Sequence, residues 1–121
     1  ISVTYVKDPT SPTWQNDPDV QAFVAWVKKY DTSVDVRDSF AAAGGYMVGI
    51  LIEKILKAAG NDLSRENILK QATNLHDVTL PMLLPGITIN TSPTDYRSIK
   101  QMQFEYFDGK NWVLTGSLVS E

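Results

Sequence analysis

The sequence predicts a mixed α/β protein with three helices and a sheet that is incomplete. The chain opens with a β-branched and aromatic run over residues 1–6, which is typical of a strand. Three segments with apolar residues at helical spacing follow, and two alternating runs flank Asp108-Gly109 near the end. One strand at the front and a few at the back are too few to cover three helices.

The first element is residues 1–6, which we expect to form a buried strand. A lone strand of parallel type cannot satisfy its own backbone groups, so other strands must lie beside it. We therefore expect either a second chain at this strand or, as the favoured reading, that this chain is the tail of a longer protein. Pro9 and Pro12 then predict an extended connector rather than a tight turn.

The first helix is predicted to start at Asp17-Pro18, since Asp is a good N-cap and Pro suits the first helical position. Lys28 and Lys29 fall in its last turn, where the helix dipole favours cations. One apolar stripe follows the helical period and should face a core, namely Val20, Phe23, Val24, Val27 and Tyr30.

The second helix is predicted from near Asp38-Ser39 to Ala59, with Gly60 just past its end. Its first half is apolar all round, which is typical of a helix buried on most sides. Gly44 and Gly45 each weaken a helix by roughly 1 kcal/mol relative to Ala. We therefore expect another element or a ligand to approach this backbone, with close packing as the default.

The third helix should begin after Ser64, with Leu63 and Ile68 as a hydrophobic staple. Its apolar stripe continues through Leu69, Ala72 and Leu75. Residues 87–91 alternate like a strand, and residues 92–95 read as a turn. Asp108-Gly109 between alternating runs predicts a C-terminal hairpin from Met102 to Thr115.

Composition excludes several classes of function. A net charge of −3 and a pI near 5.0 argue against nucleic acid as a partner, because phosphates require a basic surface. The absence of cysteine removes disulfides, zinc–thiolate sites and thiol nucleophiles. The longest uncharged apolar run, residues 40–52, is too short to span a membrane and contains three glycines.

The sequence offers few catalytic groups. His76 beside Asp77 is the single histidine, and no activated nucleophile accompanies it, so a surface histidine is the favoured reading. The acidic residues of the two connectors lack the spacing of a calcium loop. We therefore predict no enzyme activity, no cofactor and no metal.

Aromatic residues suggest where a pocket and a core lie. Trp112 and Phe104 fit core packing on the hairpin. Trp14, Phe40 and Tyr46 are the better candidates for a pocket. Trp26 shares a helix with Phe23, so at most one of these two rings can lie on its exposed side.

Three segments resemble the C-terminal part of periplasmic substrate-binding proteins of ABC transporters, of the branched-chain amino acid (Leu/Ile/Val) type, also called extracellular ligand-binding receptors. The similarity covers essentially the whole chain, and the most specific piece is ITINTSPTDY followed by FDGKNWV. The segments are YVKDPTSPTWQNDPDVQAFVAWVKKY, GGYMVGILIEKILKAAGNDLSRENILKQATNL and LPGITINTSPTDYRSIKQMQFEYFDGKNWV.

The resemblance implies an incomplete part of a type I periplasmic-binding-protein fold, in which two Rossmann-like lobes are joined by crossovers. Residues 1–6 would be a strand of lobe 2, residues 7–97 part of lobe 1, and residues 98–121 a hairpin of lobe 2. Residues 7–14 and 98–101 would be crossovers between the lobes, and the ligand would lie in the cleft between them.

The function implied by the resemblance is solute capture for an ABC importer in the periplasm, or outside a Gram-positive cell on a membrane anchor. The solute would be an amino acid or a related small carboxylate, aliphatic or aromatic, and the permease would be the protein partner. Part of the pocket wall would come from the start of the second helix, at Phe40, Ala41, Ala43 and Tyr46. Relatives often carry a larger side chain, often Tyr, at the position of Gly44, so glycine there implies either a larger pocket or the loss of an aromatic contact.

Two alternatives stay open at this stage. The same fold serves as the extracellular ligand-sensing domain of receptors and regulators. An enzyme using His76 and Asp77 is the less favoured class. We also expect the chain by itself to self-associate, or to pair with a missing N-terminal part, because an open sheet leaves unpaired edges and apolar surface.

Overall fold

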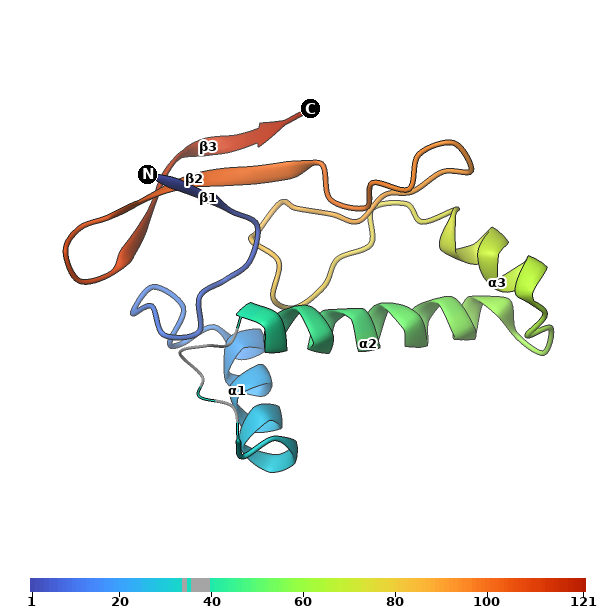
Figure 1. Cartoon of the computed structure of the whole chain (residues 1–121), viewed down its shortest axis with the longest axis horizontal. Coiled ribbons are helices and arrows are strands. Elements are labelled where there is room, and N and C mark those ends of the chain that lie inside the picture. The colour runs from blue at the N-terminus through green and yellow to red at the C-terminus, as the bar shows by residue number, and fades with distance from the viewer. Residues whose placement is uncertain (34, 36–39) are drawn as a thin grey trace.

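The computed structural model describes residues 1–33, 35 and 40–121, with the backbone only at Phe40. It confirms a mixed α/β protein with a C-terminal hairpin (Figure 1). In chain order the elements are β1 (Ser2–Thr4), α1 (Pro18–Tyr30), α2 (Phe40–Ala59), α3 (Arg65–Ala72), β2 (Gln101–Phe107) and β3 (Trp112–Ser120).

The sheet has the order β1-β2-β3, and both pairings are antiparallel. The expectation of a parallel-type first strand is therefore wrong within this chain. Val3 is opposite Phe104, and Phe104 is in turn opposite Thr115. Figure 1 shows that both termini lie at this sheet, on one side of the molecule, whereas the helices form the other side.

The helices confirm the capping signals of the sequence. The Asp17 carboxylate accepts the N–H groups of Asp19 and Val20 at 3.0 and 3.1 Å. Ser64 Oγ accepts the Asn67 N–H at 3.3 Å at the start of α3. Gly60 follows α2 with φ of +63°, the left-handed conformation that ends many helices. The predicted N-cap of α2 at residues 38–39 lies outside the described residues.

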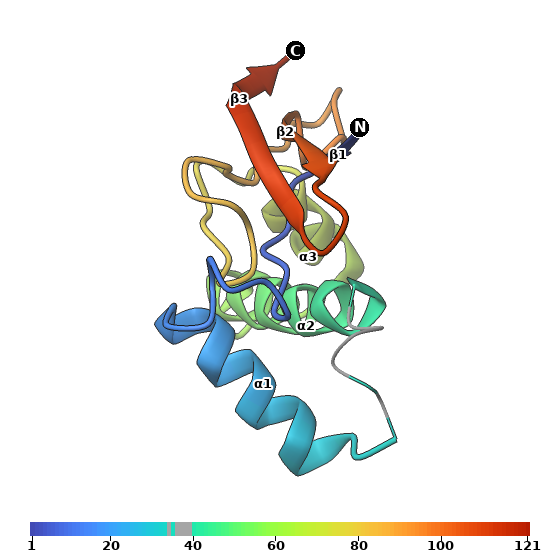
Figure 2. The ribbon, with the colours of Figure 1, turned by 90° about the vertical axis from the view of Figure 1, so that its left-hand side faces the viewer.

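The core lies between α1, α2 and the long connection that follows α3. Phe23 on α1 and Met82 in the connection are fully buried, and Ala43 on α2 meets them. Figure 2 shows α1 crossing α2 at a steep angle, with the connection above both. The connection contributes half of the buried cluster, namely Leu80, Met82, Leu83, Leu84, Ile87 and Ile89. The core therefore depends on a loop more than on the sheet.

The predicted strand at residues 87–91 is wrong as a strand, although its alternation is real. Ile87 and Ile89 are buried, as the pattern requires. Ile89 makes a single antiparallel bridge with Val78, and no ladder continues from it. The neighbouring N–H groups bond elsewhere, because the Ile87 N–H reaches Leu84 and the Thr91 N–H reaches Leu75. Alternation reports burial, whereas a strand also needs a continuous partner.

The sheet exposes the face that the sequence places in a core. Opposed residues of paired strands point to one face, so Val3, Phe104 and Tyr106 share what we call the outer face. These three side chains are 44–45% exposed. Trp112 is also 41% exposed and stacks on Phe107. The predictions of a buried first strand and of a core position for Phe104 and Trp112 are therefore wrong for this chain.

Helix α2 is likewise uncovered along one side. Val48, Ile52 and Leu56 recur every four residues and are 54%, 50% and 40% exposed. A Cβ at Gly44 or Gly45 would meet no other described atom within 4 Å. The prediction of burial on most sides and of close packing at the glycine pair is therefore wrong for the part of the chain that the structure describes. Leu69 on α3 is also 54% exposed, whereas Leu75, at the end of the predicted stripe, packs against the core.

Candidate functional site

The four residues expected at a ligand cleft take different positions. Phe40 begins α2, and its side chain lies outside the described part of the structure. Ala41 is exposed, whereas Ala43 is fully buried in the core. Tyr46 is half-buried, and its ring packs on Phe23 and Trp26 with centroid distances of 5.4 and 5.2 Å.

Two of these residues pack inside the protein, and one is exposed to solvent. Ala43 and Tyr46 face α1, so they fix how α1 and α2 pack. Ala41 is the member whose side chain is open to solvent. Trp26 is 39% exposed while Phe23 is fully buried, which confirms that only one of the two rings lies on the open side of α1.

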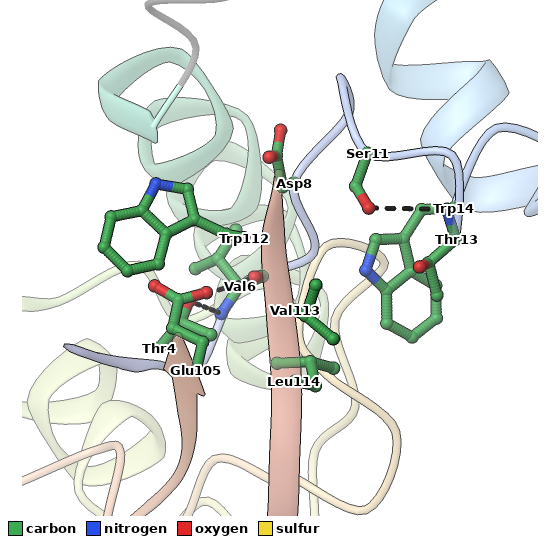
Figure 3. A pocket seen from close by; sticks show the side chains of 10 residues that line it. All are labelled: Thr4, Val6, Asp8, Ser11, Thr13, Trp14, Glu105, Trp112, Val113 and Leu114. Atoms are coloured by element: carbon green, nitrogen blue, oxygen red, sulfur yellow. Dashed lines mark hydrogen bonds between the residues drawn. The ribbon is translucent and has the colours of Figure 1, made fainter. Parts of the chain in front are cut away.

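A separate cavity of about 150 Å³ lies between the sheet and the connector that precedes α1. We call it the tryptophan crevice (Figure 3). Its walls are Thr4, Val6, Asp8, Ser11, Thr13, Trp14, Glu105, Trp112, Val113 and Leu114. In Figure 3 the indoles of Trp112 and Trp14 lie on opposite sides, and the carboxylates of Asp8 and Glu105 lie nearer to Trp112.

Strand register brings the sheet residues to this crevice. Glu105 is opposite Ser2 on one side and Leu114 on the other, so these residues share the inner face. Leu114 packs against the core, which shows that the inner face turns toward the rest of the molecule. Trp112 shares the face of Leu114 because strand side chains alternate. A carboxylate is thereby placed on the covered side of the sheet.

The connector side of the crevice is built from turns, not from the extended segment that the prolines predict. Asp8 Oδ1 accepts the N–H and hydroxyl of Thr10 at 2.8 and 2.7 Å. The Ser11 N–H donates to the Asp8 carbonyl, and the Trp14 N–H donates to the Ser11 carbonyl. These successive turns fold the connector back and hold Trp14 beside the sheet.

Lys7 lies next to the crevice, and its ammonium pairs with carboxylates outside the crevice. Its side chain is only 7% exposed, and its ammonium is 2.9 Å from Asp17 and 3.5 Å from Asp19. It also lies over the Trp14 ring, 5.6 Å from the centroid. Although partial burial opposes ionisation, the hydrogen bonds from Lys7 and from the amide of Val20 hold the pKa of Asp17 below its ordinary value.

The charge of the crevice itself is negative. Burial and the nearby charge of Asp8 raise the pKa of Glu105 above its ordinary value. Among the described residues, no hydrogen-bond donor or cation pairs with the Glu105 carboxylate. The described residues that line the crevice include no Lys, Arg or His. Sequence reasoning singled out Trp14 but missed Glu105, whose position between Phe104 and Tyr106 in an alternating strand was the available signal.

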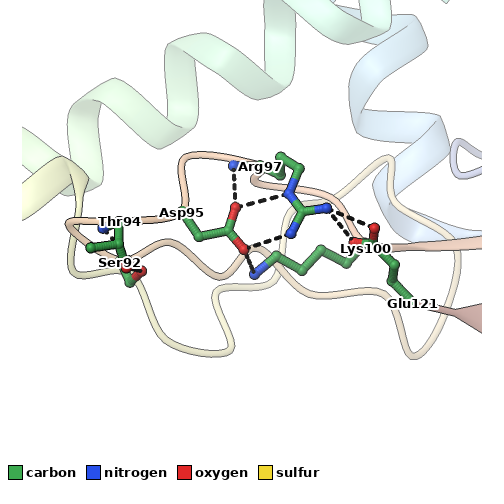
Figure 4. Close-up of polar contacts among 6 residues, drawn as sticks. All are labelled: Ser92, Thr94, Asp95, Arg97, Lys100 and Glu121. Atoms are coloured by element: carbon green, nitrogen blue, oxygen red, sulfur yellow. Dashed lines mark hydrogen bonds and ion pairs between the residues drawn. The ribbon is translucent and has the colours of Figure 1, made fainter.

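A cluster of four charged residues joins the last connection to the C-terminal residue (Figure 4). Arg97 contacts the Asp95 carboxylate through Nε at 3.0 Å and reaches both oxygens of Glu121 at 2.7 Å. Lys100 approaches Asp95 at 2.8 Å. The hydrogen bonds from Arg97 and Lys100 hold the pKa of Asp95 well below its usual range. Asp95 itself is placed by the predicted turn, in which Ser92 and Asp95 exchange backbone hydrogen bonds.

His76 and Asp77 bond to different neighbours. The His76 ring contacts Asn74 Oδ1 at 3.0 Å and is exposed. Asp77 Oδ1 accepts from Thr88 and Asn90, both at 3.3 Å. The pair therefore stabilises a loop in this structure. Among the described residues, no three carboxylate or histidine groups are arranged to hold a metal ion.

Comparisons of the chain with models of protein families, with curated proteins and with solved structures gave no match. Within the described residues, none of the helices has the length and apolar character needed to cross a bilayer.

Proposed function

We propose that this chain is part of the solute-binding component of an ABC importer, with the type I periplasmic-binding-protein fold. The solute is an amino acid or a related small carboxylate, aliphatic or aromatic, held in a cleft between two lobes. The protein acts in the periplasm, or outside the cell on a membrane anchor, and delivers its solute to a membrane permease. Its role is capture and release, without catalytic groups.

The observation that carries the proposal is the pairing of the two ends of the chain. β1 pairs with β2 along Ser2–Thr4, so the first strand and the final hairpin form one sheet. The helices and the connection after α3 form a second layer, which holds most of the buried core. A chain that starts in one lobe, passes through the other and returns has this arrangement. Residues 7–14 and 98–101 are then the crossovers.

The uncovered apolar faces support a larger protein around this chain. The outer face of the sheet and the exposed side of α2 both carry large apolar side chains, such as Phe104, Tyr106 and Ile52. Apolar patches of this kind mark surfaces that another polypeptide covers. In the proposed fold, the remaining strands and helices of the two lobes cover them.

The start of α2 supplies part of the cleft wall in this proposal. Ala41 offers an exposed methyl group, and the accessible part of Tyr46 lies one turn later. Ala43 is buried and holds the helix against α1 without touching the solute. Gly44 and Gly45 carry no side chains, and a Cβ built at either would meet no described atom within 4 Å beyond its own helix backbone and chain neighbours. This surface therefore has space for a solute in the proposed cleft.

A thermal-shift screen of the complete protein that contains this chain tests the proposal. Ligands that bind the folded state increase the free energy of unfolding by mass action, by about 2.7 kcal/mol at a hundredfold excess over Kd, and so raise the melting temperature. We expect a shift with aliphatic amino acids, aromatic amino acids or aromatic carboxylates, and none with neutral sugars. A shift with sugars alone, or with none of these solutes, would contradict the proposal.

A further inference from the structure

The tryptophan crevice combines negative charge with apolar walls. Glu105 has no donor or cation beside it among the described residues, and Asp8 adds a second carboxylate nearby. Among the described residues, Lys7 is the buried cation close by, and it is paired with Asp17 and Asp19 instead. A partly buried carboxylate without a counter-charge is unfavourable, so a bound cation would relieve that cost.

The indoles of Trp14 and Trp112 also favour a bound cation. The faces of aromatic rings attract cations, and Trp is the strongest of the three aromatic residues in this respect. The Lys7 ammonium lies over the Trp14 ring, 5.6 Å from its centroid, so this chain already places one cation against that indole. Trp112 is held by Phe107, whose ring centroid is 5.5 Å away.

The volume and lining of the crevice select the kind of cation. A cavity of about 150 Å³ accommodates a few non-hydrogen atoms, roughly the space of five water molecules. Val6, Val113 and Leu114 supply apolar contacts, and the described residues hold no group of three metal-ligating side chains. An organic cation that carries methyl groups fits this lining better than a metal ion, which would need more oxygen ligands.

We propose that the tryptophan crevice binds a small organic cation, a methylated or quaternary ammonium group, between Trp14, Trp112 and the carboxylate of Glu105. This site is distinct from the cleft in which the proposed function places a carboxylate solute. It does not depend on that function, since the crevice is built from residues of this chain alone. It lies where the connector from the sheet to α1 meets the hairpin, so occupancy would restrain these two parts relative to each other.

Indole fluorescence of the 121-residue chain tests this site with tetramethylammonium chloride as the probe. The Trp26→Phe variant serves as the background, because its remaining indoles are the two of the crevice. We expect a saturable change of emission with tetramethylammonium that equal concentrations of sodium chloride do not produce. A response that rises without saturation, or that sodium chloride reproduces, would overturn the proposal.

Two substitutions and one control locate the binding. Glu105→Gln should weaken tetramethylammonium binding at least fivefold while leaving the circular dichroism spectrum unchanged. Trp112→Leu, read by calorimetry, should weaken it by a similar factor. Glu66→Gln on α3 removes a carboxylate outside the crevice and should leave the affinity unchanged. Equal affinity in wild type and Glu105→Gln, or saturable binding of benzoate in place of the cation, would refute the assignment.

Discussion

Asp17 has two structural roles, and both follow from its place before Pro18. Its Oδ1 caps α1, and its Oδ2 neutralises the buried ammonium of Lys7 at 2.9 Å. The sequence predicts the cap, because Asp-Pro before an apolar stripe is a strong helix start. It does not predict the ion pair, because Lys7 comes from a connector whose turns are invisible to periodicity.

Asp17→Ala should therefore lower the free energy of unfolding by about 2 kcal/mol, since it removes a cap and the nearer of the two carboxylates that pair with the buried Lys7. Chemical denaturation at neutral pH measures the loss. Asp19→Ala is the matched control and should cost less than about 0.5 kcal/mol, because its carboxylate is exposed. The pKa of Asp17 is lowered by folding, so its contribution is present above the ordinary Asp range and is lost as pH falls through the lowered value. Equal losses in the two variants would contradict this role.

The pKa shift of Glu105 on folding is opposite in sign to that of Asp17. Folding raises its pKa, mainly through burial, so the ionised form is disfavoured in the folded state. Its stabilising contribution is full below the ordinary Glu range and is lost as pH rises through the raised value. Glu105→Gln should therefore raise the melting temperature by ~1–2 °C at pH 7 and leave it unchanged near pH 4. Thermal denaturation at the two pH values checks this, and a lower melting temperature at pH 7 would show that the carboxylate has a stabilising partner.

At the scale of elements, the sequence predicts what local signals encode. Caps at Asp17 and Ser64, the glycine after α2 and the Asp108-Gly109 turn specify the helices and the hairpin, and all agree with the structure. The predicted strand at 87–91 fails because a strand needs a continuous partner, and Ile89 makes only an isolated bridge with Val78. The prediction of which hairpin face is buried also fails, because alternation separates the two faces without indicating which one is covered.

The glycines of α2 and of the turn before Ile87 differ in whether they can be replaced by alanine without loss of stability. Gly86 has φ of +88°, and a Cβ there would lie 2.9 Å from Leu118 Cδ1. Gly86→Ala should therefore destabilise the fold by roughly 1–2 kcal/mol. Gly45 has open space around it, so Gly45→Ala should stabilise the isolated chain by up to ~1 kcal/mol through helix propensity. Urea denaturation compares the two variants, and a loss of stability in Gly45→Ala would show that this backbone is packed against something in solution.

At the scale of the whole molecule, polar connections hold the sheet to the helical layer. The bridge between Val6 and Leu83, and the Arg97 contacts with Asp95 and Glu121, link the two layers at different points. The sequence predicts the parts but not this assembly, because charged pairs separated by many residues leave no periodic pattern. The position of the candidate cleft residues was likewise predicted only in part, since burial of Ala43 depends on how α1 crosses α2.

The uncovered faces lead to a prediction about association. The isolated 121-residue chain should self-associate at micromolar concentrations, because Phe104 and Tyr106 expose apolar surface on an open sheet. Sedimentation velocity over a concentration series measures this. The double variant Phe104→Ser and Tyr106→Ser should shift the distribution toward monomer, whereas Tyr96→Ser, on an exposed loop, should not. A wild-type chain that sediments as a monomer at every concentration would contradict the prediction.

Solute capture between two lobes makes one further demand on the complete protein, which is closure around the solute. Small-angle X-ray scattering with and without the solute found in the thermal-shift screen measures this most directly. We predict a smaller radius of gyration in the bound state, with no change for the same protein and a solute that gave no shift. An unchanged radius of gyration at saturating solute would contradict the account of this chain as part of a two-lobe binding protein.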